Sequence, residues 1–480
     1  MLFRSVVENR EVNLTIDLCL RIGEVLLSSG AGAADVTATM QSVALHLGLR
    51  HPDLDVTFTS LSMSWQATPE DPPYSRTRLI KHRDIDYEDL TQVDHLVRDL
   101  LADRVDLREA RARLARLVSS GHPTPRWKVT IGWGVMCAGV GMQLGGGPLV
   151  IALAFVAAVL IDRLQFRMAR RRLPAFYRQV AGGAVATLIA VAARAADVSV
   201  DTSLVVTANI VMLLAGVGFM GALQDALTGF YVTAGARITE AMLATAGIIA
   251  GVSGGLSLAD ILGIDVGRLD PGAVDVKSLS LMALGGAVCA AAFGYATYAP
   301  RRSLGAIGVI AGIAMLISQS IASQGFRGPW SVAIAALFVG LVSWTVSSRL
   351  RVPPLVIVVP AVVPLLPGLS IYRGLSLLAA DTGRATSQAT SQGLLAMVTA
   401  ASVAIALASG VILGEYLAQP LEREARKLES RLAGPRLVGP IRAARFRRTG
   451  ASVPAESAPE PAVEPAVEPT VEIGQPGEPG

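Results

Sequence analysis

Residues 354–372 read Pro-Leu-Val-Ile-Val-Val-Pro-Ala-Val-Val-Pro-Leu-Leu-Pro-Gly-Leu-Ser-Ile-Tyr, a run without a charged side chain. A helix needs about 20 apolar residues to cross the hydrocarbon core of a bilayer, so this run is long enough to span a membrane. Proline inside a helix removes a backbone donor and opens the helix, and Pro360, Pro364 and Pro367 all lie within the run. The stretch therefore predicts a membrane span that is interrupted in its second part.

The surrounding sequence contains more segments of the same kind. Charged residues form 17% of the 480 positions and hydrophobic residues 52%, whereas soluble domains carry about 25% charged residues. The charges are also segregated, with 34 in residues 1–128 and only 28 in residues 129–415. This composition excludes an ordinary soluble enzyme. We predict ten spans, near 129–145, 148–163, 179–196, 203–223, 238–258, 279–298, 304–322, 330–348, 354–372 and 392–414.

The charges between the spans predict the orientation. With the N-terminus in the cytoplasm, the inner loops hold 11 Lys and Arg residues and the outer loops hold 6, as the positive-inside rule requires. We therefore expect a multi-pass plasma-membrane protein with both termini in the cytoplasm. The predicted fold class is a polytopic α-helical membrane protein of ten spans, arranged as two five-span repeats, with a small α/β cytoplasmic N-terminal domain.

Five spans per half is an odd number, so two such repeats would be inverted in the membrane, as in many secondary transporters. The tail after residue 452 repeats Pro-Ala-Val-Glu, and such a segment cannot offset its ordering entropy. The predicted organisation is a cytoplasmic domain at 1–128, spans one to five at 129–258, an outer acidic linker at 259–278, spans six to ten at 279–415, a basic juxtamembrane segment at 416–451 and a disordered Pro/Glu tail at 452–480.

The N-terminal zone alternates helical and strand patterns. Apolar residues recur at helical spacing in 12–29 and 34–48, two charged helices are predicted near 88–104 and 106–119, and the segments 55–59 and 75–81 alternate as strands. Three cysteines lie far apart, which argues against a disulfide scaffold and against a cysteine-built metal site. We expect no metal, no cofactor and no nucleic-acid partner.

The interrupted helices are the predicted substrate site. Span four contains Leu-Ala-Gly-Val-Gly-Phe-Met-Gly at 214–221, and it is the fourth span of its half, as 354–372 is of the other. Helix ends freed inside a bilayer offer positive amides to a carboxylate and carbonyls to an ammonium, a combination that suits an amino acid zwitterion. The alternative is that these residues only kink or pack their helices. The candidate binding residues are Asn209, Gly216, Gly218, Gly221, Pro364, Pro367, Gly368 and Tyr372.

Three charged residues border the fifth span and are the candidates for ion coupling: Asp225, Arg237 and Glu240. Ionisable residues in a membrane region are costly and commonly mark ion or substrate paths. Arg237 and Glu240 are three positions apart and so share a helix face. The alternative is that they form a structural ion pair at the cytoplasmic boundary.

These residues carry a family resemblance. The chain resembles the threonine/serine exporter family of actinobacteria along most of residues 12–417, although distant members have Pro-Gly where this chain has Met220-Gly221. The resemblance implies a cytoplasmic domain followed by ten spans, and export of threonine and serine driven by the proton gradient. The stretches that carry it are Arg-Ile-Gly-Glu-Val-Leu-Leu-Ser-Ser-Gly at 21–30, Leu-Gln-Asp-Ala-Leu-Thr-Gly at 223–229, Val-Thr-Ala-Gly-Ala-Arg at 232–237, Pro-Pro-Leu-Val-Ile-Val at 353–358, Pro-Leu-Leu-Pro-Gly-Leu-Ser-Ile-Tyr-Arg-Gly at 364–374 and Gly-Glu-Tyr at 414–416.

The expected partners are a small amino acid substrate, protons and membrane lipid. The sequence allows a homo-oligomer but does not predict one. One alternative function is a membrane-anchored hydrolase or sensor that acts through the N-terminal domain, with Ser28 and Asp35 beside His46 or His82. No GxSxG motif supports this alternative. A channel or scaffold is the third hypothesis, and it would show flux without accumulation.

Overall fold

The computed structural model describes residues 2–80, 83–122, 124–196, 200–213, 216–264, 276–325, 328–367, 370, 374, 377 and 387–432. The described residues up to Arg426 form one compact unit. The binding candidates Gly368 and Tyr372, most of the predicted outer linker and the predicted disordered tail lie outside the described residues.

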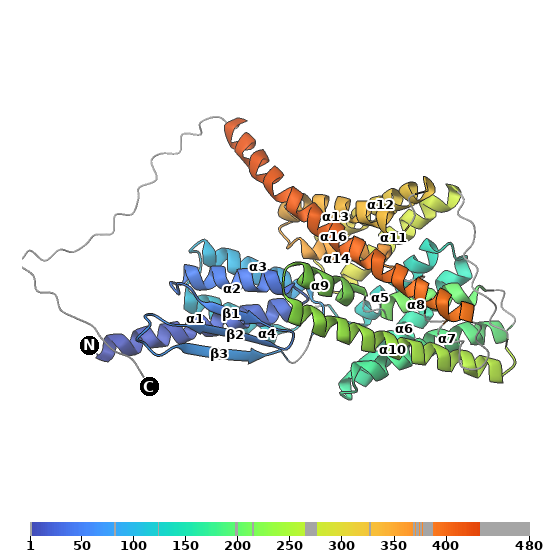
Figure 1. Cartoon of the computed structure of the whole chain (residues 1–480), viewed down its shortest axis with the longest axis horizontal. Coiled ribbons are helices and arrows are strands. Elements are labelled where there is room, and N and C mark those ends of the chain that lie inside the picture. Colours follow the sequence, from blue (N-terminus) through green and yellow to red (C-terminus); the bar gives the residue numbers. More distant parts are fainter. Residues whose placement is uncertain are drawn as a thin grey trace, which may run out of the picture. The chain divides into compact units, whose positions relative to one another are not determined.

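The first 120 residues form four helices and one small sheet (Figure 1). The sheet is antiparallel in the order β1-β2-β3. Aspartates begin two of the helices, because the side chains of Asp86 and Asp106 accept backbone N–H groups of the first turns of α3 and α4. The elements are α1 (Leu2–Ser28), α2 (Ala33–His46), β1 (Asp53–Val56), β2 (Ser60–Trp65), β3 (Tyr74–Leu79), α3 (Tyr87–Leu101) and α4 (Leu107–Ser120).

The central strand, β2, was not predicted. The predicted strand at 55–59 extends past Val56, where β1 ends. The chain turns back after Val56, where the Thr57 amide donates to the Ser60 carbonyl at 2.9 Å. In β2, Leu61 and Met63 alternate with serines and are fully buried. This period of two is a strand signal, but the serines between the two apolar residues make it weak.

Residues 126–432 form a bundle of helices. Glycine and proline begin several of them, as at Pro148 in the first turn of α6. The elements are α5 (Arg126–Gln143), α6 (Pro148–Arg170), α7 (Ala175–Ala195), α8 (Thr202–Leu213), α9 (Gly216–Leu227), α10 (Tyr231–Ile261), α11 (Val276–Ala296), α12 (Arg301–Ser323), α13 (Pro329–Leu350), α14 (Leu355–Val362), the 3-10 turn η1 (Val363–Leu365) and α16 (Ser387–Leu432).

Within the described residues, seven helices are long and apolar enough to cross a membrane, namely α6, α7, α10, α12, α13, Leu279–Ala296 of α11 and Ser391–Ala418 of α16. The other three predicted spans do not correspond to single long apolar helices. The segment 129–145 is covered by α5, and 203–223 is divided between α8 and α9. The third, 354–372, begins as α14, tightens into η1 after Val362 and is no longer helical at Pro367.

The two halves of the bundle meet where α5 crosses α11. The crossing is close because glycines face each other: a Cβ at Gly139 would lie 2.9 Å from the Gly285 carbonyl oxygen, and a Cβ at Gly285 would lie 2.7 Å from the Gly139 carbonyl oxygen. Only small residues let helix backbones approach this closely in a membrane. The contact is reciprocal, so the same face of each helix is used.

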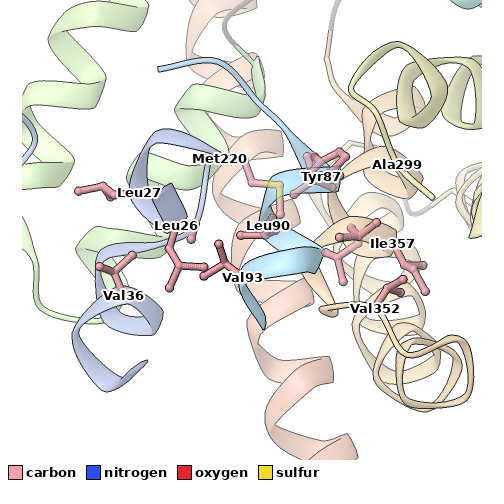
Figure 2. Packing of buried hydrophobic residues seen from close by; sticks show 14 of the residues in the cluster. Leu26, Leu27, Val36, Tyr87, Leu90, Val93, Met220, Ala299, Val352 and Ile357 are labelled. Carbon is pink, nitrogen blue, oxygen red and sulfur yellow. The ribbon is translucent and has the colours of Figure 1, made fainter. Parts of the chain in front are cut away.

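A single hydrophobic cluster joins the N-terminal elements to the bundle. Figure 2 shows Met220 of α9 reaching toward Leu90 of α3, while Tyr87 of α3 and Ile357 of α14 belong to the same buried cluster. All four side chains are at most 3% exposed. The N-terminal elements α1 to α4 with their sheet, which we call the N-terminal domain below, therefore pack directly on the two shorter helical segments, α9 and α14.

Candidate functional site

A buried ion pair lies where the N-terminal domain meets the bundle. Nη1 of Arg237 in α10 is 3.1 Å from Oδ2 of Asp225 in α9, and the two side chains are only 9% and 1% exposed. The pair also holds the turn before α2. The Ala33 amide donates to Oδ1 of Asp225 at 2.9 Å, and Nη2 of Arg237 donates to the Ala31 carbonyl at 3.1 Å. Asp225 thus caps the positive N-terminus of α2 from another domain.

The α9–α10 hairpin creates this geometry. Gly229 ends α9 with φ of +93°, which only glycine adopts without strain, and the Phe230 amide donates to the Asp225 carbonyl at 2.8 Å. The tight reversal brings the end of α9 against the start of α10. Thr233 adds a second attachment, because its hydroxyl donates to the Val56 carbonyl of β1 at 3.1 Å.

A cavity of about 160 Å³ lies on the Arg237 side of the pair. Its bundle walls come from the first two turns of α9, with Gly218 and Gly221, and from α14, with Leu355 and Val359. We call it the smaller cavity. The N-terminal domain, including Arg83, supplies one further wall, and Arg237 and Glu240 of α10 supply another. The smaller cavity therefore touches both interrupted spans at once.

Arg83 gives the smaller cavity a second positive charge. Its guanidinium lies 3.6 Å from the centre of the Phe58 ring and donates to the Phe58 carbonyl. Burial and the nearby charge of Arg237 lower the pKa of Arg83 to about 10, so it stays protonated at neutral pH. Glu240 lines the same cavity and supplies a negative charge.

A cavity of about 510 Å³ lies on the Asp225 side, and we call it the larger cavity. Asp35 of α2, Asp225 of α9 and Glu415 of α16 line it, together with the ring of Trp344 in α13. Gln224 lines both cavities. The ion pair therefore stands between two adjoining cavities, each shared by the N-terminal domain and the bundle.

The structure brings some of the predicted residues together and separates others. Gly218, Gly221, Arg237 and Glu240 line the smaller cavity, and Asp225 lines the larger one.

The other described candidates lie elsewhere. Asn209 is buried in α8 and donates to the Val205 carbonyl at 2.9 Å, and Gly216 is the first residue of α9. Pro364 is buried in η1, with Pro367 just after it, and neither lines one of the two cavities.

The alternative pairing of Arg237 with Glu240 is not formed. Arg237 turns toward Asp225 on the preceding helix, because only that carboxylate is buried beside it, whereas Glu240 is exposed. A spacing of three allows a contact but does not select it over a partner from another helix.

Sequence reasoning also missed two polar residues. Gln143 at the end of α5 donates from Nε2 to the Pro364 carbonyl at 2.7 Å, across the junction of the halves. Glu415 faces the larger cavity from within α16. Both are polar residues at the ends of apolar runs, and that was the available signal.

Two of the described residues of the alternative hydrolase, Ser28 and His46, are engaged with other partners. The Ser28 hydroxyl donates to the Val25 carbonyl at 3.0 Å, and His46 lies 3.1 Å from Asp103. His82 lies outside the described residues. The Ser28 hydroxyl and the His46 ring therefore each contact a group outside the proposed catalytic set.

Long apolar helices, two shorter interrupted segments and charges at a cavity between them are the features of a polytopic membrane transporter. The family model described as "Putative threonine/serine exporter" matches residues 17–259, and the model described as "Threonine/Serine exporter, ThrE" matches residues 282–417. The chain belongs to the threonine/serine exporter family, which is a family of transporters and not of enzymes.

Two relatives match nearly the whole chain. A "Probable threonine/serine exporter" of Mycobacterium tuberculosis is 36% identical over 438 residues, which cover 89% of this chain and 81% of the relative. The "Threonine/serine exporter" of Corynebacterium glutamicum is 32% identical over 435 residues, which cover 88% and 86%. No solved structure matches the chain.

Proposed function

We propose that this chain is a secondary transporter that exports threonine and serine across the plasma membrane, driven by the proton gradient. The names of the two relatives support the substrates. The observation that carries the proposal is the smaller cavity, because α9 of the first half and α14 of the second half both line it. A site between two interrupted helices is where transporters built from repeats bind their substrates.

The helix contacts support two equivalent halves. In the first half α7 runs along α10 (Figure 1). A Cβ at Gly183 would meet the Ile248 carbonyl, and a Cβ at Gly251 would meet the Val180 carbonyl. In this crossing each helix therefore presents a glycine to a carbonyl of the other.

The second half contains the same crossing between α13 and α16. A Cβ at Gly340 would meet the Val411 carbonyl, and a Cβ at Gly414 would meet the Leu337 carbonyl. One constant shift in numbering relates α7 to α13, and another relates α10 to α16. A shift of 157 carries Val180 and Gly183 to Leu337 and Gly340, and a shift of 163 carries Ile248 and Gly251 to Val411 and Gly414.

The order of contacts agrees with this equivalence. The contacts of α5 with α6 and α8 correspond to those of α11 with α12 and α14, and the α5–α11 crossing itself is reciprocal. We infer ten spans in two repeats, in which α8 with α9, and α14 with the segment after it, form the fourth span of each half. Because each repeat has five spans, the repeats are inverted and both termini lie in the cytoplasm.

The smaller cavity suits a small zwitterion. Its volume of about 160 Å³ is close to that of a cavity of about 150 Å³ that holds benzene, and serine and threonine have similar numbers of heavy atoms. We propose that its walls at Gly218 and Gly221 bind the substrate near the N-terminus of α9, whose free amides attract a carboxylate. The substrate ammonium faces Glu240.

The Asp225–Arg237 pair is the proposed link between ion binding and movement. Separation of Arg237 from Asp225 would break the ion pair and free the Ala31 carbonyl and the Ala33 amide that the pair holds. The turn before α2 would then be released from the bundle. Together with Glu240 these residues are the candidates for ion coupling.

Export of labelled threonine from peptide-loaded cells tests the proposal. Cells that contain the chain should export faster than cells that lack it, and collapse of the proton gradient should remove the difference. An unchanged export rate after collapse of the proton gradient would refute proton coupling. Equal export rates with and without the chain would refute threonine export.

A pair of glycine variants tests the site. A Cβ at Gly221 would lie 2.8 Å from Nη1 of Arg237, whereas a Cβ at Gly235 of α10 would meet nothing within 4 Å. We expect Gly221→Ala to slow export and Gly235→Ala to leave it unchanged. Equal effects of the two substitutions would show that the smaller cavity is not the binding site.

A further inference from the structure

Glu415 places a carboxyl group inside a membrane-spanning segment. It lies in α16 within the apolar stretch Ser391–Ala418 and is half-buried at the wall of the larger cavity. Among the described residues, no nitrogen of a Lys, Arg or His side chain lies within 4 Å of its carboxylate. An acidic residue in such a position is costly and is retained only where it serves a function.

The packing of α16 does not require this carboxylate. Glu415 follows Gly414 at the α13–α16 crossing, and its backbone N would lie 3.1 Å from a Cβ at Gly340. The corresponding contact in the first half is made by Val252, whose backbone N would lie 3.2 Å from a Cβ at Gly183. The same crossing is therefore built with valine, and glutamate adds only its charge.

The other charged groups at the larger cavity are mostly paired with one another. Asp94 lies 2.9 Å from Nε of Arg98 on α3, and Asp225 is paired with Arg237. Asp35 faces the cavity from α2, and burial together with the negative charge of Asp225 raises its pKa. The phenol of Tyr416 completes the set of titratable groups that line the cavity.

Two other carboxylates of the described bundle helices are already paired with basic side chains. Asp162 in α6 accepts from Arg126 at 2.5 Å and from the Thr130 hydroxyl at 2.7 Å. Asp225 is held by Arg237 at 3.1 Å. Glu415 differs from both because no basic side chain of the described residues pairs with it at the cavity wall.

We propose that Glu415 binds the coupling proton of this exporter and exchanges it with water through the larger cavity. The step is a simple protonation: the carboxylate takes one proton and becomes a neutral carboxyl group, and the proton later returns to water. The inference rests on the proposed function, since it names the residue through which the proton gradient would act.

Proteoliposomes that contain the full chain test the proposal with two assays. The first is threonine–threonine exchange without a gradient, and the second is threonine accumulation under a gradient of one pH unit. One-to-one coupling under such a gradient sustains about tenfold accumulation. We expect Glu415→Gln to lose this accumulation while exchange remains measurable, and Glu415→Asp, which keeps a carboxyl group, to retain both.

The matched control is Asp260→Asn, which removes an exposed carboxylate of α10 that lines neither cavity and should leave accumulation intact. Accumulation by Glu415→Gln at the level of the unmodified chain would overturn the proposal. Loss of exchange together with accumulation would also overturn it, because a packing role gives that result. Absence of exchange by the unmodified chain would instead refute the proposed function, and this inference with it.

Discussion

Replacement of Asp225 by alanine should detach the turn before α2 from the bundle. In the native chain Asp225 is 1% exposed, is paired with Arg237 at 3.1 Å and accepts from the Ala33 amide at 2.9 Å. The substitution leaves a buried guanidinium without its carboxylate, a loss that costs about 3–5 kcal/mol. It also removes the cap of α2, which is worth about 1 kcal/mol.

Hydrogen exchange at the first turn of α2 measures this loss. A cost of about 3 kcal/mol corresponds to roughly a hundredfold faster exchange of these amides, and we expect at least that change for Asp225→Ala. Asp94→Ala is the matched control, because its partner Arg98 is 54% exposed. An exposed pair of this kind contributes only about 0.2–1 kcal/mol, so exchange should change little.

A double-mutant cycle decides whether the pair itself is responsible. Arg237→Ala alone should also loosen the turn, but the double variant should lose less than the two single losses together, since neither charge is then left alone. The expected difference is about 0.5–3 kcal/mol. Strictly additive losses, or unchanged exchange in Asp225→Ala, would refute the assignment of Asp225 and Arg237 as the attachment of the N-terminal domain.

Three further predictions concern stability. Gly251→Ala should lower thermal stability by about 1–3 kcal/mol because its Cβ meets the opposite backbone, whereas Gly254→Ala on the same helix, with nothing within 4 Å, should be neutral in a thermal-unfolding assay. Burial raises the pKa of Asp86 to about 6, so the folded state binds this proton more tightly than the unfolded state does. The contribution of protonated Asp86 to the free energy of unfolding is full below about pH 4. It is lost as the pH rises through 6, and the loss is up to about 3 kcal/mol. Asp86→Asn still caps α3. It should reduce the change in the free energy of unfolding that is measured between pH 4 and pH 7. Gln143→Leu leaves the Pro364 carbonyl without its donor and should cost about 1–3 kcal/mol; an unchanged melting temperature would contradict that role.

The sequence predicts the membrane character of this chain well because apolar length is a property of each segment alone. Seven predicted spans correspond to helices that are long and apolar enough to cross a membrane. The span at 354–372 is predicted to be interrupted in its second part by Pro360, Pro364 and Pro367; α14 continues through Pro360 and ends at Val362. A proline inside a helix acts locally, so its effect is visible in the sequence.

Partners from different helices could not be predicted in the same way. The spacing of Arg237 and Glu240 indicated one helix face but gave no information about Asp225, which the hairpin at Gly229 brings opposite Arg237. The contact of Ala33 with Asp225 could not be predicted either. Ala33 contributes only its backbone amide, which nearly every residue possesses.

The glycine crossings explain where the polar residues of the bundle lie. The contacts at Gly139 and Gly285 pair the α5 position of Gln143 with the α11 position of Cys289, just as the outer crossings pair Glu415 with Val252. In both cases one half carries an apolar or weakly polar residue where the other half carries an amide or a carboxylate. Packing imposes the glycines on both halves equally, because each crossing fails if a side chain is added. The polar residues break that equality, so the glycine crossings do not require them. Gln143 donates to the interrupted helix at Pro364, and Glu415 faces the larger cavity. The residues that distinguish the two halves are therefore the ones to which transport chemistry should be assigned first.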